Sequence, residues 1–332
     1  MTKDLNQKCS DLIEALGIGA ASSITGVTSL TGGVSSDIAC VALGSHRLCV
    51  KFALAKLKVA ADWRAPLHRN KAEYEWLQFA ASIAPASAVK LYGRSDELHG
   101  FAMEYLDGNS VYLWKTALLS GQAMRDEARR VGHLIGRIHA ASTKSGFDTS
   151  QFQNRDDFYS LRLEPYLVFT ATKHPIVASR LTALADEHCK ANQVLVHGDI
   201  SPKNILFRNN TPIILDAECA TMGDASFDMA FCLNHLVLKA IHLRASHGRY
   251  LESALLLWRA YRLHIDWEQE DTLEARVCQL LPALMLARVD GKSPVEYLSA
   301  TNQSFVRTIA TSLLKSPYHS LQNLITDIES QL

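Results

Sequence analysis

The sequence predicts an α+β fold of two lobes, a small strand-rich lobe over residues 1–107 and a larger helical lobe over residues 108–332. Three observations predict this division. The first hundred residues alternate short apolar runs with turn residues, and long helical periodicities dominate the remainder. A strand-rich island, residues 194–219, interrupts the helices. We expect Asp107 and Gly108 to connect the two lobes.

The small lobe is expected to begin with a helix and to continue mainly as strands. Residues 4–16 are amphipathic, with Leu5, Leu12 and Leu16 on one side, and Gly17 ends the helix. Turn residues bound the apolar runs that follow. The predicted order is strands over 26–30, 37–43 and 47–53, a helix over 70–81, and strands over 89–91 and 100–105.

Helical spacing of apolar residues characterises the larger lobe. Residues 124–141 place Val131, Leu134 and Ile138 on one face of a helix. Similar spacing predicts the other long helices of this lobe. These helices cover residues 176–190, 227–243, 251–262 and 272–287.

Composition excludes several classes of function. Lys and Arg together number 34, as do Asp and Glu, so the chain has no excess charge for nucleic acid or an anionic membrane. The seven cysteines form no CxxC pair, which argues against a disulfide framework and a zinc site. No apolar run reaches membrane-spanning length, and residues 1–10 lack the apolar core of a signal peptide. We therefore expect a cytoplasmic protein, whose oligomeric state stays open.

The island contains two short apolar runs that can pair as a hairpin. These runs are residues 205–208 and 212–215, and residues 209–211 between them are typical of turns. In such a hairpin Asn204 enters one strand and Asp216 leaves the other at the same end. Paired residues of an antiparallel ladder lie about 4.5–5.5 Å apart at Cα. Their side-chain oxygens can therefore share one Mg²⁺, which needs few protein ligands and keeps positions for phosphate and water.

Asp199 lies five residues before Asn204, on the loop that leads into the hairpin. From there its carboxylate could reach a substrate hydroxyl beside a metal-bound phosphate and accept the proton. Phosphoryl transfer requires positioning, charge neutralisation and an oriented nucleophile more than covalent chemistry by the protein. Asp199, Asn204 and Asp216 together supply that set.

The same residues carry a resemblance to a known family. His-Gly-Asp-x-x-x-x-Asn, which ends at Asn204 and precedes Asp216 by twelve residues, resembles the aminoglycoside phosphotransferase and choline kinase superfamily, relatives of protein kinases. Leu-Asp-Ala-Glu ending at Glu218, followed by Gly-x-x-x-Phe-Asp ending at Asp228, is most similar to the methylthioribose kinases. Those enzymes typically carry Ser where this chain has Asn204, so the similarity to them is partial.

The resemblance implies a protein-kinase-like fold that uses ATP and Mg²⁺. It also implies that Asp199 is the catalytic base and that Asn204 and Asp216 bind the magnesium. Glu218 would be a second acidic group at the metals. His197 is expected to brace the loop by packing and hydrogen bonding rather than to touch the substrate.

A lysine in the middle of a predicted strand indicates the nucleotide side of the site. Lys51 faces opposite to its apolar neighbours in residues 47–53, and burial of such a lysine is costly without a partner. A solvent-exposed edge strand is the alternative explanation. In the family, the strand lysine contacts the α- and β-phosphates and pairs with a helix glutamate. Arg-x-x-x-Glu-x-x-x-Leu, which ends at Leu77, resembles the corresponding helix of the methylthioribose kinases, and this resemblance favours Glu73 as that partner. Glu75, which faces another side of the helix, is the reserve candidate.

Two further segments are candidates for binding ATP. Residues 31–36 lie where a loop over the phosphates belongs, and glycine lets backbone N–H groups approach phosphate oxygens, although an ordinary hairpin turn explains the same residues. Residues 101–106 resemble the hinge strand that binds adenine through its backbone. The candidates are Gly32, Gly33 and Ser35 in the loop and Met103, Glu104 and Tyr105 in the hinge.

The predicted function is an ATP- and Mg²⁺-dependent kinase that phosphorylates a hydroxyl of a small molecule. A sugar or polyol such as methylthioribose is slightly favoured as acceptor over an aminoglycoside or a choline-like amino alcohol. A nucleotide-binding module without catalysis is an alternative from another class, although Lys51, Asp199, Asn204 and Asp216 are all present. A protein kinase is disfavoured because the chain has no Asp-Phe-Gly or Ala-Pro-Glu segment.

Overall fold

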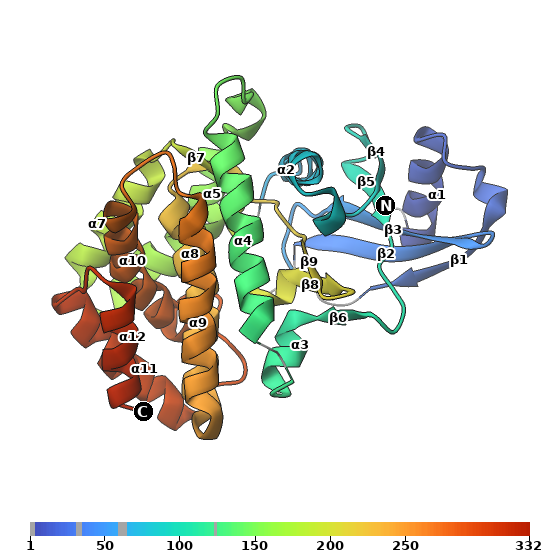
Figure 1. The fold of residues 1–332 in the computed structure, drawn as a ribbon. Helices are drawn as coiled ribbons and strands as arrows, with labels where there is room; N and C mark the ends of the chain where they lie inside the picture. Colours follow the sequence, from blue (N-terminus) through green and yellow to red (C-terminus); the bar gives the residue numbers. More distant parts are fainter. Residues whose placement is uncertain (1–3, 31–34, 59–64, 123–124) are drawn as a thin grey trace.

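The chain forms a small lobe built on one sheet and a larger lobe built mainly from helices (Figure 1). The computed structural model describes residues 4–30, 35–58, 65–122 and 125–332. The predicted α+β architecture of two lobes is confirmed. The predicted boundary after residue 107 falls between strand β5 (Gly100–Glu104) and strand β6 (Val111–Leu113).

An antiparallel sheet of five strands, in the order β1-β2-β3-β5-β4, forms the small lobe. Helix α1 (Leu5–Ala15) packs on one face, where its Cys9, Leu12 and Ile13 meet Val50 and other buried residues of the sheet. The other face meets helix α2 (Arg69–Ile83). The remaining strands are β1 (Ile24–Ser29), β2 (Ser36–Leu43), β3 (His46–Ala53) and β4 (Leu91–Ser95).

The prediction of strand β4 at residues 89–91 was wrong. The strand covers Leu91–Ser95 and pairs with β5, with a register shift at Gly93, where φ is 136°. β4 is an edge strand whose residues are all half-buried, so it lacks the apolar alternation that reveals a strand. A turn at residues 96–99 follows β4, and in it the N–H of His99 donates to the carbonyl of Asp96 at 3.3 Å.

The larger lobe packs helices α9, α10 and α11 against α8 (Ala225–His242). Helix α4 crosses α9 at Gly132, where a Cβ atom would lie 2.2 Å from the carbonyl oxygen of Leu257, so only glycine permits this approach. α11 and α12 are not among the predicted helices, nor is the π-helix η4 (Tyr159–Val168). The long helices are α4 (Arg125–Ser142), α7 (Ala178–Lys190), α8 (Ala225–His242), α9 (His247–Tyr261), α10 (Glu270–Asp290), α11 (Ala300–Lys315) and α12 (Leu321–Ser330).

The predicted hairpin is present as strands β8 (Ile205–Arg208) and β9 (Thr211–Ile214), between the sheet and the helices (Figure 1). Asn209 and Asn210 form its two-residue turn with φ values of 52° and 61°, which Asn adopts more readily than most residues. Strand β6 lies beside β8, and β7 (Val194–Val196) pairs with β10 (Thr221–Gly223). Within the described residues no helix is apolar over enough length to cross a membrane.

Candidate active site

A cleft of about 400 Å³ lies between the sheet and the β8–β9 hairpin. Its apolar walls come from both lobes, and four charged or amide side chains of the predicted site, Lys51, Glu73, Asn204 and Asp216, line it. The three hinge candidates also line it. The apolar lining includes Leu30, Ile38, Cys49, Leu206 and Leu215, and the hinge contributes Met103, Glu104, Tyr105 and Leu106.

Lys51 is the centre of a buried charge cluster on the sheet side of the cleft. It lies in β3, between β2 and β5, so the alternative of an exposed edge strand does not hold. Its Nζ lies 2.6 Å from Oε2 of Glu73 and also contacts Asp216. Burial lowers the pKa of Lys51, but the carboxylates of Asp216 and Glu73 outweigh burial and raise the pKa above its ordinary value. Lys51 is therefore a fixed cation, and Glu73 rather than Glu75 holds it.

Asp216 follows β9 in an unusual backbone conformation. Its φ is 71°, in the left-handed region that is costly for residues other than glycine, although Asp tolerates it better than most. The main chain therefore turns at this residue, and its side chain joins Lys51 in the cleft. Burial opposes the charge, but Lys51 and Lys203 hold the pKa of Asp216 well below its usual range. The group is an anion, the form in which a carboxyl group binds a metal.

Asn204 stands at the same end of the hairpin as Asp216. The N–H of Leu215 donates to the carbonyl of Asn204 at 2.9 Å, which continues the ladder by one pair and leaves Asp216 just beyond it. The amide nitrogen of Asn204 donates to the carbonyl of Asp199 at 3.0 Å. Because its nitrogen is engaged, the amide presents its oxygen as the free polar atom. An amide oxygen and a carboxylate on one cleft suit a hard divalent cation.

Asp199 has one engaged and one free carboxylate oxygen. Oδ2 lies 2.9 Å from Nη2 of Arg162 and 3.2 Å from Nζ of Lys203, which itself lines the cleft. Oδ1 is buried and accepts no hydrogen bond from any residue that the structure describes. A buried acceptor without a partner is costly, and it is suited to receive a proton from a bound hydroxyl.

Asp228 of α8 fixes the loop that carries Asp199. Its carboxylate accepts the N–H of His197 at 2.6 Å and the N–H of Gly198 at 2.8 Å. His197 in turn accepts the N–H of Asp199 on Nδ1 and donates from Nε2 to the carbonyl of Leu215, both at 3.1 Å. Burial lowers the pKa of His197, which fits this neutral form. His197 therefore joins the loop of Asp199 to the loop of Asp216.

Glu218 does not line the cleft but pairs with a buried arginine. Nε of Arg69, a residue with no exposed surface, lies 2.9 Å from Oε2 of Glu218. The same guanidinium donates to the carbonyls of Ser35 and Leu54, so it connects the loop of Glu218 to the end of the sheet. A metal-binding role for Glu218 stays a prediction. Of the loop candidates, Ser35 is held here by its backbone, whereas Gly32 and Gly33 lie outside the described residues.

Sequence reasoning missed several residues that shape the site. Arg162 comes from the π-helix η4 and donates from Nε to the carbonyl of Gly198 at 2.6 Å, besides its contact with Asp199. Lys203 lies inside the recognised motif, four residues after Asp199, and this spacing was the available signal. Arg162 carries no such signal because it lies 37 residues before Asp199.

Replacing Arg162 with methionine is expected to move the acidic limb of the pH profile of kcat/KM to higher pH. A base acts only when deprotonated, so activity falls as the pH drops through its pKa. Burial raises the pKa of Asp199, but Lys203 and Arg162 outweigh burial and lower the pKa. Loss of either cation therefore raises the pKa. Lys203→Met should shift the limb in the same direction, and an unmoved limb in both variants would contradict this assignment.

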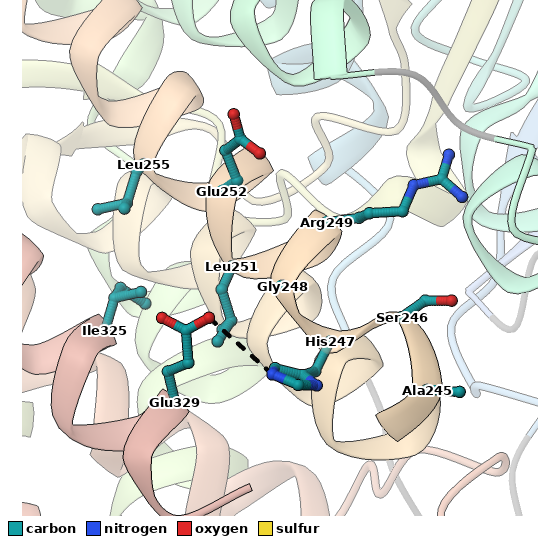
Figure 2. Close-up of a pocket in the computed structure, with 10 residues that line it drawn as sticks. All are labelled: Ala245, Ser246, His247, Gly248, Arg249, Leu251, Glu252, Leu255, Ile325 and Glu329. Atoms are coloured by element: carbon teal, nitrogen blue, oxygen red, sulfur yellow. Dashed lines mark ion pairs between the residues drawn. The ribbon is translucent and has the colours of Figure 1, made fainter.

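A second hollow, of about 550 Å³, lies in the larger lobe where α9 begins beside α12 (Figure 2). Its side chains include one ion pair, between His247 and Glu329 at 3.9 Å. It contains none of the predicted site residues and shares no lining residue with the cleft. The cleft between the lobes is therefore the candidate active site.

The fold and the cleft define the class of protein, and comparison with known proteins identifies the family. The chain belongs to the phosphotransferase enzyme family, whose model matches residues 27–264, and it is a small-molecule kinase. The family predicted from the His-Gly-Asp motif is thereby confirmed. The methylthioribose kinase of Bacillus cereus (strain AH820) is 20% identical over 267 residues, which cover 68% of this chain and 67% of that enzyme.

Solved structures share the fold over almost the whole chain. A choline/ethanolamine kinase family protein from Mesorhizobium loti has a TM-score of 0.55 at 15% identity, with 98% of this chain and 100% of that chain covered. Amicoumacin kinase hAmiN, in complex with AMP-PNP, Ca²⁺ and Ami, has a TM-score of 0.56 at 14% identity and the same coverage. The predicted two-lobed, kinase-like fold is confirmed.

Proposed function

We propose that this kinase transfers the γ-phosphoryl group of ATP, bound with Mg²⁺, to a hydroxyl of a small sugar or polyol. One observation carries the proposal: Asp199, with a buried and unpartnered Oδ1, contacts Lys203, which lines the cleft that holds the Lys51–Glu73 pair. The relative named methylthioribose kinase supports a sugar acceptor. The complex of hAmiN with AMP-PNP and Ca²⁺ supports a nucleotide with a divalent cation.

Each part of the cleft has a distinct role in this proposal. Residues 103–105 bind the adenine through the hinge backbone, and Lys51 orients the α- and β-phosphates while Glu73 holds it in place. Asn204 and Asp216 hold the Mg²⁺, which neutralises phosphate charge when bound. Both residues fit this role because they carry oxygen ligands and line the same cleft.

Asp199 acts on the acceptor. Its Oδ1 takes the hydroxyl proton as the oxygen attacks the γ-phosphorus, and ADP leaves with the electron pair of the broken P–O bond. Arg162 and Lys203 keep the other carboxylate oxygen fixed and the group deprotonated. The loop anchored on Asp228 positions the base relative to the metal ligands.

A screen of acceptors, read as ADP release with Mg·ATP, tests the proposal. The panel contains sugars, polyols, aminoglycosides and choline, and a sugar or polyol is expected to support turnover. Turnover with aminoglycosides or choline instead would move the acceptor to the alternative class. Tight binding of Mg·ATP without transfer to any acceptor would favour a nucleotide-binding module and overturn the enzymatic proposal.

Replacing Glu73 with glutamine is expected to raise the KM for ATP about 10–100-fold, because a charge-assisted hydrogen bond is worth about 1.5–3 kcal/mol. The neutral amide no longer draws Lys51 toward α2. Glu75→Gln is the matched control on the same helix, since Glu75 lies 3.8 Å from Arg94 and outside the lining of the cleft. Equal KM values in the two variants would remove Glu73 from this role.

A further inference from the structure

A small cavity beside the cleft is rich in cations. It is lined by Lys115, Lys203, Lys239 and Arg288, with His235 and Glu296, and its volume of about 20 Å³ has room for about one water-sized group. Lys115 and Lys203 line both this cavity and the cleft, so the two spaces adjoin. Lys203 also contacts Asp199, which places the cavity on the acceptor side of the catalytic base.

Within the described part of the chain, two of the four cations have a carboxylate partner within 4.0 Å and two do not. Nζ of Lys115 lies 2.5 Å from Oε1 of Glu296, and Lys203 pairs with Asp199. Among the residues described here, no carboxylate lies within 4.0 Å of Lys239 or Arg288. Yet both are buried, with 1% and 9% of their surface exposed. Buried cations without counter-charges are costly, which is why they usually mark a function.

The polar atoms of this cavity are also incompletely hydrogen-bonded. Nζ of Lys239 donates to the carbonyl of His235 at 3.4 Å and lies 5.1 Å from the ring centre of Tyr297. Nε2 of His235, Nε of Arg288 and the hydroxyl of Tyr297 are buried and without a partner in the part of the chain that the structure describes. All three residues line the cavity, and a buried donor without a partner favours a ligand that accepts hydrogen bonds.

Burial, together with the charges of Lys115 and Arg288, lowers the pKa of Lys239 to about 7. A bound anion would act oppositely and stabilise the ammonium form. The group is therefore poised to gain a proton and a counter-charge together.

We propose that Lys239, Arg288 and the unpartnered groups around them form an anion subsite that binds the carboxylate or phosphate of an anionic acceptor alcohol. The inference rests on the proposed function and narrows its acceptor class to polyols and sugars that carry an acid group. One oxygen of the anion enters the cavity, which has room for about one water-sized group, while a hydroxyl of the same molecule faces Asp199 across Lys203. Polycationic aminoglycosides and choline meet like charges at this position, which disfavours them.

Pairs of acceptors that differ in one acid group test whether the enzyme prefers an anionic acceptor. Glycerate and glycerol 3-phosphate are compared with glycerol, and gluconate with glucitol, as kcat/KM at saturating Mg·ATP. We expect the acid of each pair to be preferred at least about tenfold, since charged hydrogen bonds are worth about 1.5–3 kcal/mol. Comparison of glycerate with glycerol 3-phosphate distinguishes carboxylate from phosphate. Turnover of the neutral polyols at equal or better efficiency would overturn the subsite and leave the proposed function standing.

Lys239→Met tests whether Lys239 binds the anion. The matched control is Lys315→Met, which changes an exposed lysine on α11. The probe is inorganic sulfate, titrated by calorimetry at constant ionic strength with saturating Mg·AMP-PNP. Wild-type protein and Lys315→Met are expected to bind sulfate, and Lys239→Met at least about tenfold more weakly. Unchanged affinity for Mg·AMP-PNP in Lys239→Met shows that it is folded. Sulfate that binds all three proteins alike, or none of them, overturns the subsite whatever the acceptor screen shows.

Discussion

Replacing Asp199 with asparagine is expected to lower kcat about 10²–10⁴-fold, the usual contribution of a general base. The amide has the shape of the carboxylate but cannot accept the hydroxyl proton. The affinity for Mg·ATP should change little, because Asp199 does not line the nucleotide cleft. This pattern, a loss confined to kcat, identifies an interaction that operates in the transition state.

The measurement is steady-state turnover with the best acceptor, together with calorimetry of Mg·AMP-PNP on the same preparations. Asp186→Asn, an exposed carboxylate of α7, serves as control and should match the wild type. Turnover of Asp199→Asn within about threefold of the wild type would remove Asp199 from the role of base.

Replacing Asp216 with alanine is expected to weaken Mg·AMP-PNP binding by at least about 100-fold. Even groups that only support metal ligands cost about 10–100-fold in metal affinity when replaced, so loss of a ligand should cost no less. The variant also leaves Lys51 with Glu73 as its remaining carboxylate partner in the cleft. Binding of AMP-PNP in excess EDTA should change less, because the metal contributes nothing to it.

Asp216→Asn separates the lost charge from backbone strain. Asparagine tolerates the left-handed conformation at this residue, where φ is 71°, better than alanine does. Both variants should lose affinity if the carboxylate binds the metal, and only Asp216→Ala should lose it if strain is the cause. Wild-type affinity for Mg·AMP-PNP in both would exclude Asp216 as a ligand.

The sequence predicted the parts of the fold that depend on local chemistry. The β8–β9 hairpin was predictable because turn residues separate two short apolar runs, and helix α4 because its apolar residues recur at helical spacing. Strand β4 was misplaced because edge strands need no alternation. The π-helix η4 contains Pro165, and its hydrogen bonding has no recognisable pattern in a single sequence.

Some residues of the candidate active site could likewise be predicted from the sequence, and others could not. Asp199, Asn204 and Asp216 lie within one short segment, so spacing alone indicated that they act together. The resemblance favoured Glu73 as the partner of Lys51 and kept Glu75 in reserve, and only the orientation of α2 on the sheet shows that Glu73 is the partner. Lys239 was not predicted as functional because it lies outside the recognised motifs, and its burial among other cations emerges only from the packing around α8.

A crystal structure with AMP-PNP and Mn²⁺ in place of Mg²⁺ tests most directly whether one hairpin holds the metal beside the base. Anomalous scattering locates Mn²⁺ without ambiguity. The ion is expected within bonding distance of oxygens from Asn204 and Asp216, with the γ-phosphate between it and Asp199. Mn²⁺ bound elsewhere, or Asp199 directed away from the γ-phosphate, would contradict the account.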